Sequence, residues 1–138
     1  MIVIQLLFRL YISNMIDKNL NYALVGASSN LEKYGNKIFQ DLLNWEYNVV
    51  PVNPNEEEIL WIKAYSSLSE ISFNIDVVIC VVPPVVTEKI IDEIILLWIK
   101  NVWMQPWSES DVAIQKCLHN WINVVHNSCI MIQRKTNM

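Results

Sequence analysis

Residues 21–37 constrain the fold of this chain more than any other stretch. A short apolar run, Tyr22–Val25, ends at Gly26, and small residues follow before a helical pattern starts near Gly35. This order predicts a buried strand, a tight turn and the start of a helix. Backbone N–H groups in such a turn can approach a phosphate at the helix N-terminus, where the helix dipole favours negative charge. The segment therefore predicts a site for a phosphorylated nucleotide.

Apolar runs and helical patterns alternate along the rest of the chain. Further strands are expected at residues 47–52, 75–82, 101–104 and 123–126, and helices at residues 35–43, 86–97 and 108–120. This alternation implies right-handed βαβ units and a mainly parallel sheet. The expected fold class is therefore α/β, a three-layer doubly wound domain with a sheet of about five strands. Ligands of such domains bind outside the carboxyl ends of the strands.

Composition narrows the class of protein. A chain of 138 residues with 53% hydrophobic and 17% charged residues is expected to form one domain without a long disordered tail. Its net charge of −4 argues against a nucleic-acid binder. Cys80, Cys117 and Cys129 are too scattered for a zinc site and indicate reduced thiols in a cytoplasmic protein.

Residues 1–14 differ from the rest of the chain. They are apolar but interrupted by Gln5 and Arg9, and too short to span a bilayer as a helix. They also lack the basic start and the cleavage site of a signal peptide. We expect a non-native or disordered extension, with Met15 as the true start and the folded domain at residues 15–138. A membrane-surface anchor is the less favoured alternative.

Six short motifs occur in a fixed order within residues 20–132. They are Gly26-Ala-Ser-Ser29, Lys33-Tyr-Gly-Asn-Lys37, Val50-Pro-Val-Asn-Pro54, Val81-Val-Pro-Pro84, Val102-Trp-Met-Gln-Pro106 and Cys129-Ile-Met131. In this order they resemble small stand-alone CoA-binding proteins, a family similar to the N-terminal Rossmann-like domain of the succinyl-CoA synthetase alpha subunit. Each motif alone is weak evidence, but six in order are specific. The resemblance implies a Rossmann-like fold and coenzyme A, or an acyl-CoA, as the ligand.

The residues expected to hold this ligand lie where the motifs follow the predicted strands. The turn after Gly26 suits the diphosphate of coenzyme A, and Gly35 is expected to let the helix pack closely. Asn53 follows the second strand, where NAD binders usually carry an acid, and an uncharged amide there favours coenzyme A over NAD. By resemblance, a glutamine after the fourth strand lines the same crevice. The expected binding residues are Gly26, Ala27, Ser28, Ser29, Lys33, Tyr34, Gly35, Val52, Asn53, Pro54, Val82, Pro83, Pro84 and Gln105.

Some of these residues also have a purely structural interpretation. Turn and capping chemistry alone would explain the two serines. Pro83 and Pro84 also start a helix, which is compatible with lining a ligand path. Lys33 is a source of positive charge near a phosphate, although a surface lysine is often only solvated.

Groups suited to catalysis are scarce. His126, Ser128 and Cys129 lie close together in the sequence, but nothing supplies a visible orienting group or an oxyanion hole. We therefore expect no catalytic residue and no metal ligand.

The favoured function is a cytoplasmic protein that binds or senses coenzyme A. The alternatives are a subunit of a split NDP-forming acyl-CoA synthetase and, less favoured, an NAD(P)-binding module. The expected partner is the small molecule, with neither nucleic acid nor membrane, and a homodimer is left open.

The chain has two glycines and six tryptophans, whereas an average glycine usage of roughly 7% would give about ten glycines. The resembling family usually carries glycine at or beside five of the tryptophan positions, while Trp103 matches a family tryptophan. These five are Trp45, Trp61, Trp98, Trp107 and Trp121. We hypothesise that they are glycine in the natural product, because a UGA codon that means glycine in the source has been translated as tryptophan. Trp98 and Trp121 follow expected helices, where glycine readily takes the left-handed conformation. The alternative is that the five are genuine tryptophans packed on exposed turns.

Overall fold

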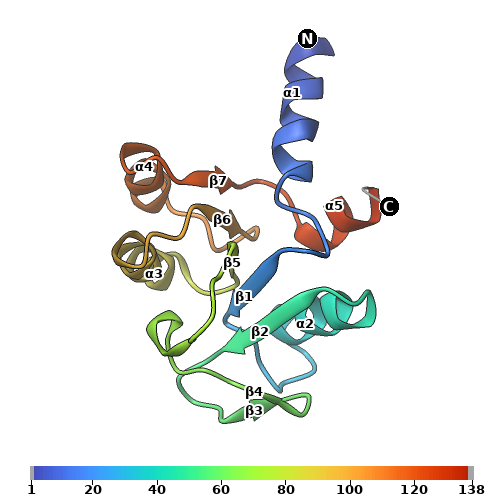
Figure 1. Cartoon of the computed structure of the whole chain (residues 1–138), viewed down its shortest axis with the longest axis vertical. Helices are drawn as coiled ribbons and strands as arrows, with labels where there is room; N and C mark the ends of the chain where they lie inside the picture. The colour runs from blue at the N-terminus through green and yellow to red at the C-terminus, as the bar shows by residue number, and fades with distance from the viewer. Residues whose placement is uncertain (1, 137–138) are drawn as a thin grey trace.

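The computed structural model describes residues 2–136 and contains a five-stranded parallel sheet between two layers of helices (Figure 1). The strands of this sheet are β1 (Asn21–Val25), β2 (Asn48–Val52), β5 (Val77–Cys80), β6 (Asn101–Met104) and β7 (Asn123–Val125). Their spatial order is β2-β1-β5-β6-β7, and all four neighbouring pairs are parallel. The predicted doubly wound α/β fold with a mainly parallel sheet is confirmed.

Helices cover both faces of the sheet. Helices α2 (Tyr34–Asn44) and α5 (Ile130–Thr136) lie on one face, and α3 (Pro84–Leu96) and α4 (Asp111–His119) lie on the other (Figure 1). One buried cluster includes Phe39 of α2 and Ile130 of α5, and a second includes Ile91 of α3 and Cys117 of α4. The strands are therefore buried on both faces, which explains their continuous apolar sequences.

The topology creates a crevice at the carboxyl ends of β1 and β5. These two strands pair with each other, and β2 lies on the far side of β1. The chain therefore leaves β1 in one direction along the sheet and, after β2, continues on the opposite side of β1. Connections that depart in opposite directions open a gap at the end of the sheet, which is the usual ligand position in such folds.

Several short elements were not predicted. Strands β3 (Glu58–Ile59) and β4 (Ile62–Lys63) form an antiparallel hairpin, followed by the 3₁₀ helix η1 (Leu68–Glu70). Helix α5 was also missed. Elements of two to seven residues are too short to show a periodic hydrophobic pattern, so the sequence carries little signal for them.

The N-terminal segment forms helix α1 (Ile2–Ser13), which projects away from the sheet (Figure 1). Its apolar side chains from Ile2 to Leu10 are largely exposed, whereas Ile12 belongs to the core together with Met15. The Tyr11 hydroxyl donates a hydrogen bond to the carbonyl of Val124, 3.2 Å away. That residues 1–14 are a non-native extension stays a prediction, and Met1 lies outside the described residues. Within residues 2–136, the helices are too short or too polar to cross a bilayer.

Four tryptophans have a left-handed backbone. Their φ angles are 68° at Trp61, 61° at Trp98, 76° at Trp107 and 58° at Trp121. All four side chains are at least 78% exposed. This conformation suits glycine and is an outlier for a bulky residue. The expectation that Trp98 and Trp121 take the left-handed conformation after helices α3 and α4 is therefore confirmed.

The other two tryptophans differ from these four. Trp103 is fully buried, and its Nε1 donates a hydrogen bond to the carbonyl of Ser128 at 3.0 Å. Trp45 has a φ of −97° at the end of α2, and the left-handed residue of that turn is its neighbour Glu46. The backbone thus favours glycine at four of the five proposed positions and not at Trp45.

Replacement of Trp61, Trp98, Trp107 and Trp121 by glycine should stabilise the fold, by up to about 1.5 kcal/mol at each position. A left-handed backbone costs a non-glycine residue about 1–2 kcal/mol, and the greater freedom of glycine in the unfolded chain offsets about 0.5–1 kcal/mol of the gain. Urea denaturation measures the free energy of unfolding. As a control, Trp103→Gly should lower it by about 3–5 kcal/mol. Destabilisation by all four glycine substitutions would contradict the assignment.

The recoding hypothesis itself is tested on the gene and on the native protein. UGG codons at these positions, or tryptic peptides of the native protein with the mass of tryptophan there, would refute it.

Candidate functional site

The turn after β1 depends on two residues that lack a side chain. Gly26 has a φ of 95°, and a Cβ atom there would lie 2.2 Å from the carbonyl oxygen of Val81. A Cβ atom on Gly35 would lie 2.0 Å from the carbonyl oxygen of Gly26. Both approaches are far closer than atoms can come without a shift of the backbone. The expectation that Gly35 permits close packing of the helix is therefore confirmed.

This packing brings the N-terminus of α2 to the crevice. Lys33 precedes the helix with an extended backbone, and its side chain makes no capping hydrogen bond. In the first helical turn the amide of Asn36 donates to the carbonyl of Lys33 at 3.1 Å, and the amides of Tyr34 and Gly35 are left to a ligand or to solvent. They lie at the positive end of the helix dipole, and the side chain of Lys33 adds a positive charge beside them. This part of the crevice is suited to an anion.

The first of two neighbouring cavities, here called the turn cavity, has a volume of about 480 Å³ and lies at the ends of β1, β2 and β5. Its predicted residues are Gly26, Ser28, Lys33, Tyr34, Gly35, Val52, Asn53, Pro54, Val82 and Pro83. Its other wall was not predicted. Ser66 and Ser67 contribute from the loop after β4, and Glu93 contributes from α3. These residues belong to no recognisable motif, so only the folded chain places them at the site.

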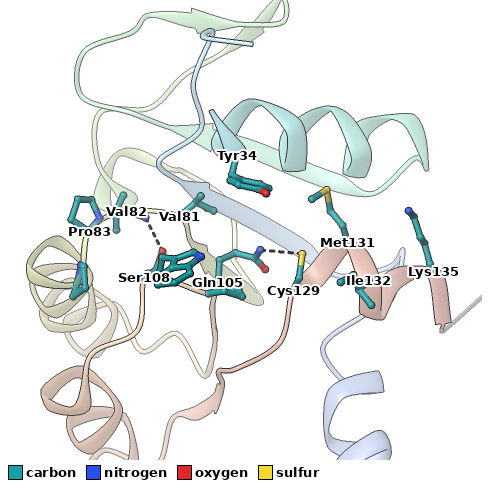
Figure 2. A pocket seen from close by; sticks show the side chains of 13 residues that line it. Tyr34, Val81, Val82, Pro83, Gln105, Ser108, Cys129, Met131, Ile132 and Lys135 are labelled. Atoms are coloured by element: carbon teal, nitrogen blue, oxygen red, sulfur yellow. Dashed lines mark hydrogen bonds between the residues drawn. The ribbon is translucent and has the colours of Figure 1, made fainter. Parts of the chain in front are cut away.

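The second cavity, here called the apolar cavity, has a volume of about 740 Å³. It shares Tyr34 and residues 81–83 with the turn cavity, so the two cavities lie side by side along this wall. Figure 2 shows the side chains of Tyr34 and Met131 reaching toward the same space from α2 and α5. The remaining lining residues are Pro84, Gln105, Pro106, Trp107, Ser108, Cys129, Ile132 and Lys135.

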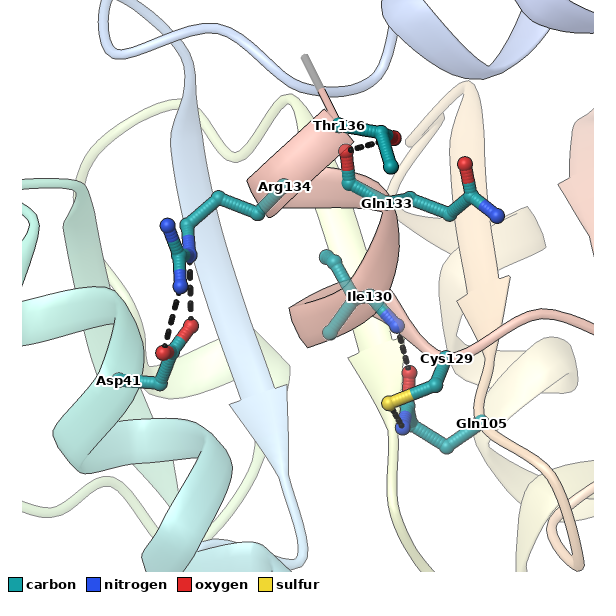
Figure 3. Close-up of polar contacts among 7 residues, drawn as sticks. All are labelled: Asp41, Gln105, Cys129, Ile130, Gln133, Arg134 and Thr136. Carbon is teal, nitrogen blue, oxygen red and sulfur yellow. Dashed lines mark hydrogen bonds and ion pairs between the residues drawn. The ribbon is translucent and has the colours of Figure 1, made fainter. Parts of the chain in front are cut away.

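The two buried polar side chains of the apolar cavity, Gln105 and Ser108, are bonded within the protein. The Oε1 atom of Gln105 accepts a hydrogen bond from the amide of Ile130 at 2.7 Å, and its Nε2 atom donates to Cys129 Sγ at 3.4 Å (Figure 3). The hydroxyl oxygen of Ser108 accepts from the amide of Val82 at 3.1 Å (Figure 2). Gln105 therefore lines the crevice, and it also joins the end of β6 to the N-terminus of α5.

A buried ion pair holds α5 against α2. The guanidinium group of Arg134 donates two hydrogen bonds of 2.8 Å to the carboxylate of Asp41 (Figure 3). Arg134 is 1% exposed, and its guanidinium also lies 4.7 Å from the ring centroid of Trp45. Because α5 carries Met131 and Ile132, this pair fixes one wall of the apolar cavity.

Two of the predicted residues line neither cavity. Ala27 is fully buried, and the amide of Ser29 donates a hydrogen bond of 3.0 Å to the carboxylate of Glu56. Ser28 lines the turn cavity, but its hydroxyl oxygen accepts from the amide of Asn30 at 3.0 Å. Turn chemistry therefore accounts for Ser28 in this structure, and the ligand contacts of these residues stay predictions.

Beside the end of β2 lies a carboxylate, Glu56, that no sequence motif places at the site. The Nδ2 atom of Asn53 donates to the carbonyl of Ala27 at 2.9 Å and to Glu56 at 3.3 Å. The carboxylate of Glu56 thus lies beside Asn53, because the chain turns within the three residues that follow Asn53. Asn53 alone does not separate coenzyme A from NAD.

The interactions of the three cysteines and of His126 do not pair a thiol nucleophile with a histidine base. Burial raises the pKa of the Cys80 and Cys117 thiols to about 12, so both stay neutral at physiological pH. Cys129 is half-buried, and its sulfur accepts from Gln105. The Nδ1 atom of His126 lies 3.1 Å from the side-chain amide of its neighbour Asn127.

Comparisons with known proteins show what this chain is similar to. The family model described as "CoA binding domain" matches residues 20–135. The ADP-forming acetate–CoA ligase of Methanocaldococcus jannaschii is 35% identical over 71 residues, 51% of this chain and 10% of that protein. The alpha subunit of the ADP-forming acetate–CoA ligase II of Pyrococcus furiosus is 42% identical over 62 residues, 44% of this chain and 14% of that subunit. The matches thus span a small part of these relatives. A hypothetical protein from Pyrococcus horikoshii superimposes with a TM-score of 0.88 and 32% identity, covering 93% of this chain and 90% of that one.

The substitution Gly35→Ala should remove the anion site and destabilise the fold by at least about 2 kcal/mol, because its Cβ atom would collide with the backbone of Gly26. Denaturation measures the loss of stability, and a titration with inorganic pyrophosphate measures the loss of anion binding. Asn44→Ala, at the exposed end of the same helix, is the control and should change neither. An unchanged stability in Gly35→Ala would contradict the close contact.

Proposed function

The chain belongs to the CoA-binding domain family, and we propose that it binds coenzyme A or an acyl-CoA as a non-catalytic binding or sensing protein. The observation that carries the proposal is the contact between Gly26 and Gly35, which leaves no room for a side chain between the turn and the helix. Such a cradle brings backbone amides close to a diphosphate. It lies at the strand ends, where ligands of this fold class bind.

The hydrogen bond between Ser29 and Glu56 supports an anion at this turn. An anionic oxygen already accepts from the Ser29 amide at 3.0 Å. A phosphate oxygen is an acceptor of the same kind, and Lys33 adds a positive charge on the cavity wall. On this proposal the ligand phosphate competes with the Glu56 carboxylate for the turn.

On this proposal the polar part of the ligand lies in the turn cavity and its apolar part in the apolar cavity. The turn cavity would hold the diphosphate against Gly26, Ser28 and the start of α2, with the ribose and its 3′-phosphate toward Asn53 and Pro54. The pantetheine arm would pass Val82 and Pro83 into the apolar cavity. The two cavities share the wall formed by Tyr34 and residues 81–83, which suits a ligand with a charged part and an apolar part.

A second candidate function is a subunit of a split NDP-forming acyl-CoA synthetase. The match to the alpha subunit of the Pyrococcus furiosus ligase favours it, because that protein is itself one part of a divided enzyme. In this case the chain would present coenzyme A to groups supplied by another chain.

A ligand panel tests the main proposal. Calorimetric titration should show binding of coenzyme A, weaker binding of dephospho-CoA because the 3′-phosphate contacts are lost, and little binding of ATP. A preference for NAD over coenzyme A would reject the proposal and favour the NAD(P)-binding module.

A matched pair of lysine variants is the control for this panel. Lys33→Ala should weaken coenzyme A binding by about tenfold, which corresponds to the loss of one charge-assisted hydrogen bond to phosphate. Lys89→Ala, on the exposed side of α3, removes the same charge away from both cavities and should leave the affinity unchanged. Equal losses in the two variants would point to a general charge effect instead of a site.

The synthetase alternative is tested by reconstitution with a chain that carries an ATP-grasp domain and is encoded next to this gene. On the main proposal, the mixture forms no acyl-CoA from acetate, ATP and coenzyme A. Product formation that depends on both chains would favour the alternative.

A further inference from the structure

The surface that the apolar cavity presents to a ligand is mostly hydrocarbon. Its buried polar side chain, Gln105, is engaged by Ile130 and Cys129, and the hydroxyl oxygen of Ser108 already accepts from Val82. Polar atoms that are paired inside the protein gain little from a ligand. The polar groups of the lining that are not engaged within the protein belong to the exposed residues Tyr34, Trp107 and Lys135. The remaining surface that a ligand meets is hydrocarbon, from residues such as Pro84, Met131 and Ile132.

The volume of the cavity exceeds what the end of a pantetheine arm requires. At about 740 Å³ it is larger than the turn cavity of about 480 Å³, and it falls within the range of about 300–1,000 Å³ typical of small-molecule pockets. An adenine ring fits this environment poorly, because its polar edge needs hydrogen-bond partners and the amide of Gln105 is already engaged. A flexible Met131 side chain on the wall adapts to chains of different length.

We propose that the apolar cavity takes an unbranched hydrocarbon acyl chain, so that the preferred ligand is an acyl-CoA of medium length and not free coenzyme A. This inference rests on the proposed function, because the chain is anchored through coenzyme A at the turn cavity. A dicarboxylic acyl group is disfavoured, because its second carboxylate would lose hydration against carbon. Lys135 is exposed and solvated, so its attraction for such a carboxylate is small.

Calorimetric titration with coenzyme A and with acetyl-, butyryl-, hexanoyl-, octanoyl- and succinyl-CoA tests the inference. A fully buried methylene is expected to raise the affinity about fourfold. The dissociation constant should therefore fall by about twofold to fourfold per methylene until the cavity is filled, and succinyl-CoA should bind about tenfold more weakly than butyryl-CoA. Equal affinities for free coenzyme A and all acyl-CoAs would overturn the inference and leave the proposed function standing. Failure of every coenzyme A species to bind would overturn both.

A pair of aspartate variants locates the effect. Ile132 is 59% exposed and lines the cavity, whereas Val112 is 53% exposed on α4 and lines neither cavity. Ile132→Asp should abolish the dependence on chain length, measured within this variant as the ratio of the dissociation constants of butyryl-CoA and octanoyl-CoA. Val112→Asp should keep the full dependence. Retention of the dependence in Ile132→Asp would place the acyl chain elsewhere and overturn the inference.

Discussion

The contact between the backbone of Gly35 and the carbonyl oxygen of Gly26 determines where every part of the site lies. With no Cβ atom on Gly35, helix α2 begins directly against the turn after β1. The same contact places Lys33 beside the turn and Tyr34 on the wall common to both cavities. Helix α2 then fixes α5 through the ion pair of Asp41 and Arg134. One close approach of two backbones thus positions the anion site and, through a second helix, the apolar cavity.

The sequence predicts those parts of the structure that are determined by residues close to one another in the chain. Continuous apolar runs predicted β1 and β5, and the glycine-containing turn predicted the packing of α2. Helix α5 was not predicted from the sequence, because it has seven residues and its N-terminus is fixed by Gln105, which lies 25 residues earlier in the chain. Glu56 was overlooked for a similar reason, since only the folded loop carries its carboxylate back to Ser29 and Asn53.

The tryptophans illustrate how composition and backbone geometry inform each other. A shortage of glycine in the sequence predicts positions with strained φ angles, and four exposed tryptophans occupy such positions while buried Trp103 does not. Trp45 is the exception, because the left-handed residue of its turn is Glu46. Trp107 matters most for function, since it combines a positive φ with a place on the wall of the apolar cavity. A glycine there would relieve strain and widen the mouth of the cavity at once.

The chemistry of the site favours holding a thioester over attacking it. The sulfur of Cys129 accepts a hydrogen bond from Gln105, and the ring of His126 is engaged by Asn127. The other two thiols are buried and kept neutral by their raised pKa values. A thioester brought to this cavity would meet mostly hydrocarbon, and the described residues that line it pair no thiol with a histidine. On the synthetase alternative, the group that acts on the bound molecule would come from another chain, whereas the proposed binding function needs no such group.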